Sequence, residues 1–273
     1  MSRTVRLWIV PAALLAVAVV VTAVLTGGGD DGGSTGADDG TGTPSAERVE
    51  RGRYLARVGN CSGCHTERGG EPLAGGFTLE TEFGTFRTPN ITPDAETGIG
   101  DWSREQFRDA LRRGERADGA PLYPACPYPS FTHARAEDID AIHAWIQSID
   151  PVEHETRDHD LDFPYGVRGL VNAWQWTFFE PGELEPEEEK DERWHRGRYL
   201  VEGLGHCNEC HRDRGTFGAV REAADAPGGT IHGWYAPSLN SPDEAGLQQW
   251  STEEAADLLR SGTDAPENQR QAM

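Results

Sequence analysis

Two short motifs of cysteine and histidine are the residues whose types and spacing could do chemistry in this 273-residue chain. Their sequences are Cys61-Ser62-Gly63-Cys64-His65 and Cys207-Asn208-Glu209-Cys210-His211. A Cys-x-x-Cys-His pattern is typical of c-type haem attachment, because two thiols at this spacing can form thioethers to both vinyl groups of one haem. The adjoining histidine then serves as the proximal iron ligand. A redox dithiol or half of a zinc site is the alternative for one such motif, but its repetition favours two covalently bound haem c groups.

Each haem also needs a distal ligand if its iron is six-coordinate, and methionine is a common choice. The two methionines of the chain are Met1 and Met273, and Met1 precedes an apolar segment that removes it from consideration. Cys126 follows Gly114 at nearly the same interval as Met273 follows Gly262. We therefore predict Cys126 as the distal ligand of the first haem and Met273 as the distal ligand of the second.

Other roles for Cys126 remain open at this point. Cys126 could be a free thiol beside a five-coordinate haem, or His133 could bind the iron in its place. A bound thiolate would donate electron density and lower the potential of the haem relative to methionine ligation. We expect His143 and His206 to be ordinary polar or packing residues, and His232 is a weaker candidate for binding iron.

The surroundings of the two motifs repeat as well. The matching pairs are Arg51-Gly52-Arg53-Tyr54-Leu55 with Arg196-Gly197-Arg198-Tyr199-Leu200, Pro89 with Pro237, and Trp102-Ser103 with Trp250-Ser251. This register predicts a mainly α protein with two tandem class I-like cytochrome c domains, at residues 45–150 and 194–273.

Local signals predict the helices of the first domain. Ser45 can cap a helix that leads into the first motif. Ser103 and Gln106 form a capping box for a second helix, which Gly114 ends. Isoleucines at helical spacing between residues 139 and 149 predict a third helix that closes the domain.

The second domain repeats only part of this pattern. Ser251 and Glu254 again form a capping box, and we expect Leu258 and Leu259 to face inward. Met273 is the last residue, so no counterpart of the closing helix follows, and we expect either a truncated sequence or an incomplete domain. Residues 151–193 are an aromatic and acidic linker, whose aromatic residues we expect to pack between the domains.

The N-terminus carries the signals of export. Arg3 and Arg6 precede an apolar run of residues 7–25, which predicts an uncleaved transmembrane helix within residues 1–26. A cleaved signal peptide is the alternative. Residues 27–44 are rich in glycine and aspartate and predict a flexible linker. This arrangement predicts a chain anchored in the cytoplasmic membrane, with the haem domains on the periplasmic side.

The charge of the chain is strongly negative. It carries 25 lysines and arginines against 46 aspartates and glutamates, a net charge of −21. Nucleic acid is therefore excluded as a partner, because binding to phosphates needs a basic surface. The acidity serves solubility, or alternatively it steers the protein toward a basic redox partner.

With these residues in hand, the chain resembles the cytochrome c subunits of membrane-bound alcohol and gluconate dehydrogenases. The matching stretches are Gly59–Thr66, Pro89–Asp94, Gly98–Ser103, Tyr123–Ala125 and Arg196–Cys207. In that family a methionine commonly follows the Tyr-Pro-Ala triplet, at the position of Cys126. The resemblance implies electron transfer from a dehydrogenase to ubiquinone or an oxidase.

Two functions are consistent with the sequence. The first is a membrane-anchored dihaem electron carrier between a periplasmic dehydrogenase and the respiratory chain, with no catalytic residues of its own. The second is a dihaem redox enzyme of the thiosulfate dehydrogenase type, in which Cys126 would be a displaceable ligand of a catalytic haem.

Overall fold

The computed structural model describes residues 44–222, 226–231, 233–241 and 250–261, together with Glu244 and Leu247. The expected anchor, His232, Gly262 and Met273 lie outside the described residues, as does all but residue 44 of the glycine-rich linker. Within the described part of the chain, no helix is long and apolar enough to cross a membrane. We call residues 44–150 region 1 and residues 191–261 region 2, and each contains one Cys-x-x-Cys-His motif.

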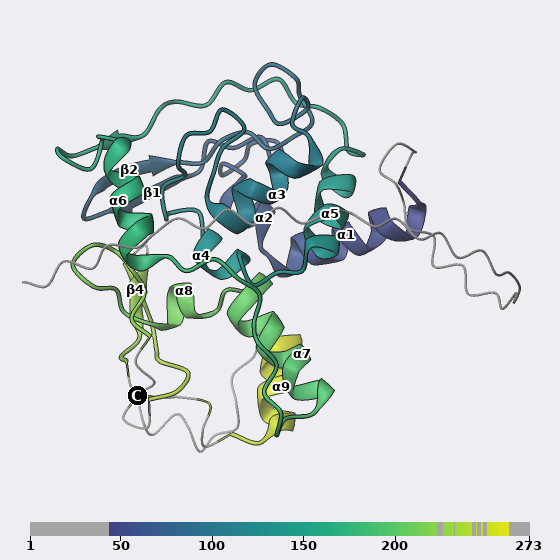
Figure 1. Cartoon of the computed structure of the whole chain (residues 1–273), viewed down its shortest axis with the longest axis vertical. Helices are drawn as coiled ribbons and strands as arrows, with labels where there is room; N and C mark the ends of the chain where they lie inside the picture. The colour runs from purple at the N-terminus through teal and green to yellow at the C-terminus, as the bar shows by residue number, and fades with distance from the viewer. Residues whose placement is uncertain are drawn as a thin grey trace, which may run out of the picture. The chain divides into compact units, whose positions relative to one another are not determined.

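Helices dominate region 1, as the sequence predicts (Figure 1). They are α1 (Ala46–Val58), α2 (Cys61–Cys64), α3 (Arg104–Arg113), α4 (Tyr128–Phe131) and α5 (Ala136–Ile146). The Ser45 side chain accepts a hydrogen bond from the Arg48 N–H at 3.2 Å and so caps α1. Ser103 and Gln106 form the predicted capping box of α3, which ends at Gly114 with φ +62°. The predicted caps of α1 and α3 and the predicted end of α3 are confirmed.

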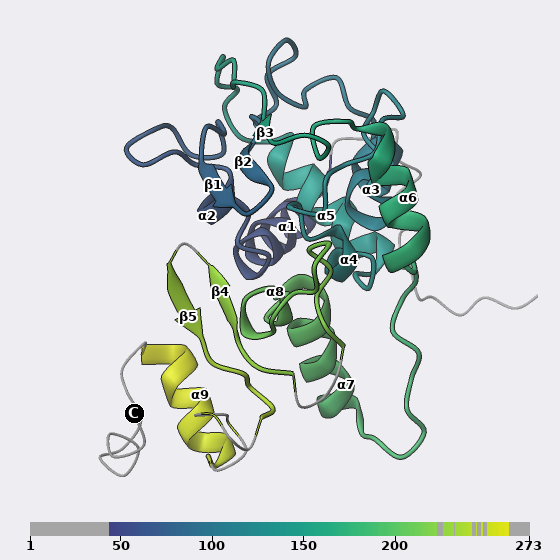
Figure 2. The same ribbon diagram turned by 90° about the vertical axis from the view of Figure 1, so that its left-hand side faces the viewer.

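The crossing of α1 and α5 organises region 1 (Figures 1 and 2). At the crossing Gly52 lies against the backbone of Ala141, so closely that a β-carbon on Gly52 would collide with the Ala141 carbonyl. Leu55 of α1 and the buried isoleucines of α5 form the core beside it. Ile149 departs from the prediction, because α5 ends before it and its side chain is only half-buried.

A small antiparallel sheet, which the sequence analysis did not predict, lies beside these helices. Its strands are β1 (Thr78–Thr81), β2 (Gly84–Arg87) and β3 (Asp160–Leu161), in the order β1-β2-β3. The register pairs Thr78 with Arg87 and Gly84 with Leu161. The third strand comes from the linker, so the linker is bound to region 1 by backbone hydrogen bonds.

The linker forms α6 (Gly169–Phe178). The large apolar side chains of the linker divide into a packed group and an exposed group. Val171 packs against the sheet, and Trp174 contacts Tyr128 of α4 edge-on and donates from its indole N–H to the Phe217 carbonyl at 2.8 Å. Contact with both regions confirms the expected packing for this group. Phe163 and Trp176, however, are 89% and 90% exposed, because nothing described covers them.

Among the residues that the structure describes, region 2 contains fewer buried side chains than region 1. It comprises α7 (Glu192–Arg198), the π-helical turn η1 (Tyr199–Leu204), α8 (Asn208–His211), β4 (Gly229–Ile231), β5 (Trp234–Ala236) and α9 (Thr252–Ser261). Ser251 and Glu254 form the predicted capping box of α9. The inward orientation expected for Leu259 is wrong: its side chain is 86% exposed, because no described element packs on that side of α9.

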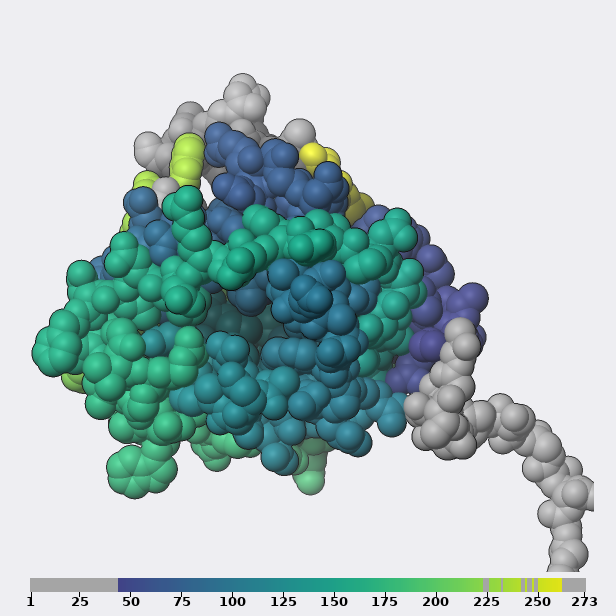
Figure 3. All heavy atoms as spheres, turned by 90° about the horizontal axis from the view of Figure 1, so that it is seen from above, coloured from purple at the N-terminus to yellow at the C-terminus, as the bar shows by residue number. Residues whose placement is uncertain are grey.

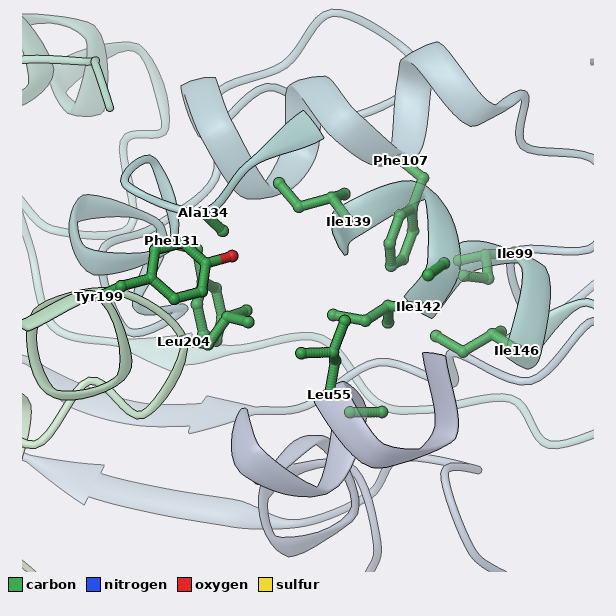
Figure 4. Packing of buried hydrophobic residues seen from close by; sticks show 12 residues of the cluster. Leu55, Ile99, Phe107, Phe131, Ala134, Ile139, Ile142, Ile146, Tyr199 and Leu204 are labelled. Atoms are coloured by element: carbon green, nitrogen blue, oxygen red, sulfur yellow. The ribbon is translucent and has the colours of Figure 1, made fainter. Parts of the chain in front are cut away.

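The two regions share one hydrophobic core. Tyr199 and Leu204 of η1 are buried in the cluster formed by α1, α4 and α5, and Figure 4 shows them beside Phe131 and Ala134. The Tyr199 hydroxyl donates to Asp138 of α5 at 2.6 Å. The same fully buried carboxylate accepts from the guanidinium of Arg51 in α1. One aspartate therefore joins three elements across the junction.

Candidate haem-binding site

The first motif is held by the end of α1 and a sharp turn. Asn60 adopts a left-handed conformation, with φ +51°, between α1 and α2, and α2 then carries both cysteines. The Nδ1 atom of His65 lies 2.8 Å from the carbonyl oxygen of Pro89. A carbonyl can only accept, so Nδ1 carries the proton and Nε2 keeps a lone pair for a metal. Burial lowers the pKa of His65, although the bond to Pro89 opposes this, and the ring stays neutral.

The histidine of the second motif makes the same kind of contact. The Nδ1 atom of His211, at the end of α8, lies 2.7 Å from the carbonyl oxygen of Pro237. Orientation of a ligating histidine by a carbonyl acceptor on its other nitrogen is characteristic of metal sites. The sequence repeat matched Pro89 with Pro237, but the role of their carbonyl oxygens emerges only in the structure. In both histidines Nε2 is therefore the ring nitrogen whose lone pair could bind a metal.

Cys126 lies in a turn near the first motif. Its backbone N–H donates to the Tyr123 carbonyl at 3.1 Å. Burial raises the pKa of the Cys126 thiol to about 12, and negative charge on Cys64 and on Cys61 adds to this effect. The thiol is therefore close enough to both attachment cysteines to interact with them electrostatically. Without a cation it is a neutral thiol, and a ferric ion would favour the thiolate.

Comparison with known proteins agrees with this geometry. Residues 49–150 match the family model described as "Cytochrome c". A nicotinate dehydrogenase subunit of Pseudomonas putida is 42% identical over 82% of this chain and 19% of its own length. The gluconate 2-dehydrogenase cytochrome c subunit of Pantoea cypripedii is 39% identical over 78% and 51%. The cytochrome c subunit of the quinone alcohol dehydrogenase of Gluconobacter oxydans is 40% identical over 78% and 47%.

Residues 49–150 therefore form a cytochrome c domain by this match, and the chain as a whole is similar to cytochrome c subunits. The homology to cytochrome c subunits of dehydrogenases confirms the resemblance stated from the sequence. The chain spans at most about half the length of the relatives named above. A cytochrome c domain implies covalently bound haem c.

The residues of this cytochrome fit a haem at the first motif. Besides the oriented His65, the hydroxyl of Tyr128 is buried and makes no hydrogen bond with the described residues. The neighbouring Gln175 amide donates instead to the Gly114 carbonyl at 3.1 Å. Burial raises the pKa of Tyr128, so the hydroxyl remains a hydrogen-bond donor. A buried donor without a protein acceptor is costly, and this one is suited to an acceptor on a cofactor.

Two histidines outside the motifs, His133 and His206, make contacts with backbone carbonyls. His133 lies with Nδ1 2.8 Å from the Gly182 carbonyl and so helps to hold the linker. His206 lies with Nε2 3.2 Å from the Gly59 carbonyl and contacts the ring of Phe131. The contact of His133 leaves its Nε2 with a lone pair, so it does not decide between Cys126 and His133, and Cys126 as the distal ligand stays a prediction.

His143 packs against Phe107, with ring centroids 5.2 Å apart, and its Nε2 lies 3.3 Å from the Trp102 carbonyl. Burial lowers the pKa of His143. The Trp102 carbonyl and Asp140 act in the opposite direction, and two arginines of α1 and α3 add slightly to the lowering. The expectation that His143 is a packing residue is confirmed.

The two motifs of the cytochrome lie close together. Charge on Cys210 raises the pKa of Cys64, second only to the effect of burial. The residues that precede the two motifs also touch, through the bond from His206 to Gly59. Figure 2 shows α8 below α1 and α4, at the edge where region 2 meets region 1. The sequence repeat does not reveal this proximity, because a repeat says nothing about how its copies dock.

The linker that follows region 1 contributes to the surface of the molecule on the face that Figure 3 shows. In the space-filling view of Figure 3, teal linker segments lie against blue segments of region 1, and the surface is hollowed between them. The linker is therefore part of the molecular surface on this face.

Proposed function

We propose that this chain is a dihaem c-type cytochrome that carries electrons between a dehydrogenase and the respiratory chain. The observation that supports this most directly is the repeated orientation of the motif histidines, His65 by Pro89 and His211 by Pro237. Independent recurrence of the same contact is expected of two haem sites and has no purpose in a redox dithiol. Haem supplies one-electron chemistry to such a protein.

The residues of this chain bind and orient the two groups. In this proposal Cys61 and Cys64 hold the first haem, and Cys207 and Cys210 hold the second. Cys126 is the distal ligand of the first haem. Met273, outside the described residues, is the distal ligand of the second. Regions 1 and 2 are then two tandem cytochrome c domains.

The junction supports electron exchange between the two sites. Cys64 and Cys210 interact electrostatically, and η1 is buried in the core of region 1. Such packing fixes the separation and orientation of the sites, so an electron would not have to wait for a domain motion. In this proposal region 1 and region 2 act as one conduit.

The partners and location belong to the same proposal. The electron donor is a dehydrogenase, because the relatives include dehydrogenase cytochrome c subunits, and the acceptor is on the quinone or oxidase side. Residues 1–26 anchor the chain in the cytoplasmic membrane, with the haem domains in the periplasm and residues 27–44 as the linker.

Haem counting tests the proposal. The exported full chain should contain two haem c groups per polypeptide by pyridine haemochrome assay. Replacement of Cys207 and Cys210 by alanine should leave one, and so should replacement of Cys61 and Cys64. A wild-type content of one haem would refute the dihaem assignment.

The function itself is tested with the purified dihaem protein. It should accept electrons from a dehydrogenase preparation and reduce a soluble quinone analogue in stopped-flow absorbance. Steady turnover of thiosulfate with ferricyanide would instead identify the thiosulfate dehydrogenase type of enzyme.

A further inference from the structure

The carboxylate of Glu209 lies at the junction between the two motifs. Glu209 is part of the second motif, and its side chain is only 10% exposed. Its Oε1 accepts a hydrogen bond from the Ser130 hydroxyl at 2.8 Å, and its Oε2 accepts one from Arg214 at 2.6 Å. The charge is therefore nearly buried and fixed in position from both sides.

The contact with Ser130 brings this charge to region 1. Ser130 belongs to α4, which begins two residues after Cys126, and it is itself buried. Negative charge on Glu209 contributes to the raised pKa of the Cys126 thiol, as a smaller cause than burial. At Cys210, by contrast, Arg214 opposes Glu209 and has the larger effect. Within its own motif, the charge of Glu209 is therefore offset by Arg214.

We propose that Glu209, although it belongs to the second motif, lowers the midpoint potential of the first haem. The ferric state carries one more positive charge than the ferrous state, so a fixed negative charge nearby stabilises the ferric state. Burial keeps this interaction from being screened by water. Glu209 would therefore be a positioning residue that makes the potential of one site depend on the docking of the other. This inference rests on the proposed two-haem cytochrome.

The test is a spectroscopic redox titration of the full dihaem chain at fixed pH. Glu209→Gln removes the charge but keeps the shape and the ability to bond to Ser130. Glu202→Gln is the matched control, because Glu202 is in the same region, is 39% exposed and pairs with Arg198. The step of the first haem is assigned with the Cys207→Ala/Cys210→Ala variant, and independently as the step whose absorption band changes in Cys126→Met.

We expect Glu209→Gln to shift the first step upward, and by more than it shifts the second, while Glu202→Gln leaves both in place. Ser130→Ala should shift the first step upward by a smaller amount, because the charge is kept but is no longer held toward region 1. An unmoved first step in Glu209→Gln, or an equal shift in Glu202→Gln, would overturn the inference. Haem content separates the two proposals: one haem per chain refutes the dihaem assignment, whereas two haems with unmoved potentials refute only the role of Glu209.

Discussion

The close approach of α1 and α5 at Gly52 makes a sharp prediction about stability. In Gly52→Ala the new β-carbon would collide with the carbonyl oxygen and carbon of Ala141 and approach the Trp145 β-carbon to 2.9 Å. The first two atoms are backbone, so no side-chain rotation can relieve the collision. Helix α5 must move away from α1, and the packing between the two helices loosens.

The expected change in the free energy of unfolding is the balance of one favourable and two unfavourable effects. Alanine is favoured over glycine inside a helix by about 0.5–1 kcal/mol. Overpacking a core costs about 1–3 kcal/mol, and more when backbone must shift. Separation of the helices also exposes part of Leu55 and of the α5 isoleucines, each of which contributes roughly 1.5–3 kcal/mol when fully buried. We expect a net loss of about 2–4 kcal/mol, and thus a fall in Tm of about 5–15 °C for a protein of this size.

Gly197 provides the matched control within the same chain. It occupies the position of Gly52 in the repeat, lies in α7, and a β-carbon there would meet no atom within 4 Å. Gly197→Ala should therefore be neutral or stabilise by about 0.5–1 kcal/mol. Both variants are compared by thermal unfolding, followed by circular dichroism and by haem absorbance. A Gly52→Ala protein as stable as the wild type would falsify the packing argument, and equal losses in both variants would point to helix propensity instead.

Three further predictions concern single side chains. Tyr199→Phe removes the 2.6 Å bond to buried Asp138 and should destabilise by about 1.5–3 kcal/mol, whereas Tyr54→Phe, at the exposed equivalent position, should have no effect in the same denaturant titration. Burial lowers the pKa of His143 below its ordinary 6.5, so the folded state favours the neutral ring. The neutral His143 ring therefore contributes to the free energy of unfolding above pH 6.5, and this contribution is lost as the pH falls from 6.5 toward the pKa of the folded state. Melting curves between pH 7.5 and 5 should show this loss, and His143→Gln should reduce it. Cys126→Met should raise the lower step of a redox titration, and an unchanged spectrum and potential would show that Cys126 does not bind iron.

The helices and motifs were predictable because their signals are local. The Ser45 cap and the Ser103–Gln106 capping box involve residues three positions apart, and the structure contains both. The spacing of the isoleucines likewise predicted α5, since helical periodicity is a property of neighbouring turns. Leu259 was mispredicted because the same periodicity does not say whether another element covers the face.

The site geometry was less predictable because it depends on contacts distant in sequence. The Pro89 carbonyl that orients His65 lies 24 residues further on, and the sheet uses a strand from the linker. The signal in the sequence for this contact was the repetition of Pro89 as Pro237. A proline has no backbone N–H to donate, but its carbonyl oxygen can still accept a hydrogen bond. The repetition alone does not show that either proline segment folds back against its motif.

The two copies of the Arg-Gly-Arg-Tyr-Leu sequence show the limit of repeat-based reasoning most clearly. Tyr54 and Tyr199 are equivalent in sequence, yet Tyr54 is 55% exposed and Tyr199 only 6%. The difference arises because η1 docks against α5, where Asp138 receives Tyr199 from the second copy and Arg51 from the first. Breaking a buried carboxylate away from its partners is strongly destabilising, so this contact fixes how region 2 sits on region 1. The same docking brings Glu209 to Ser130, and the electrostatic environment of one haem motif therefore depends on a residue that sequence alone would assign to the other.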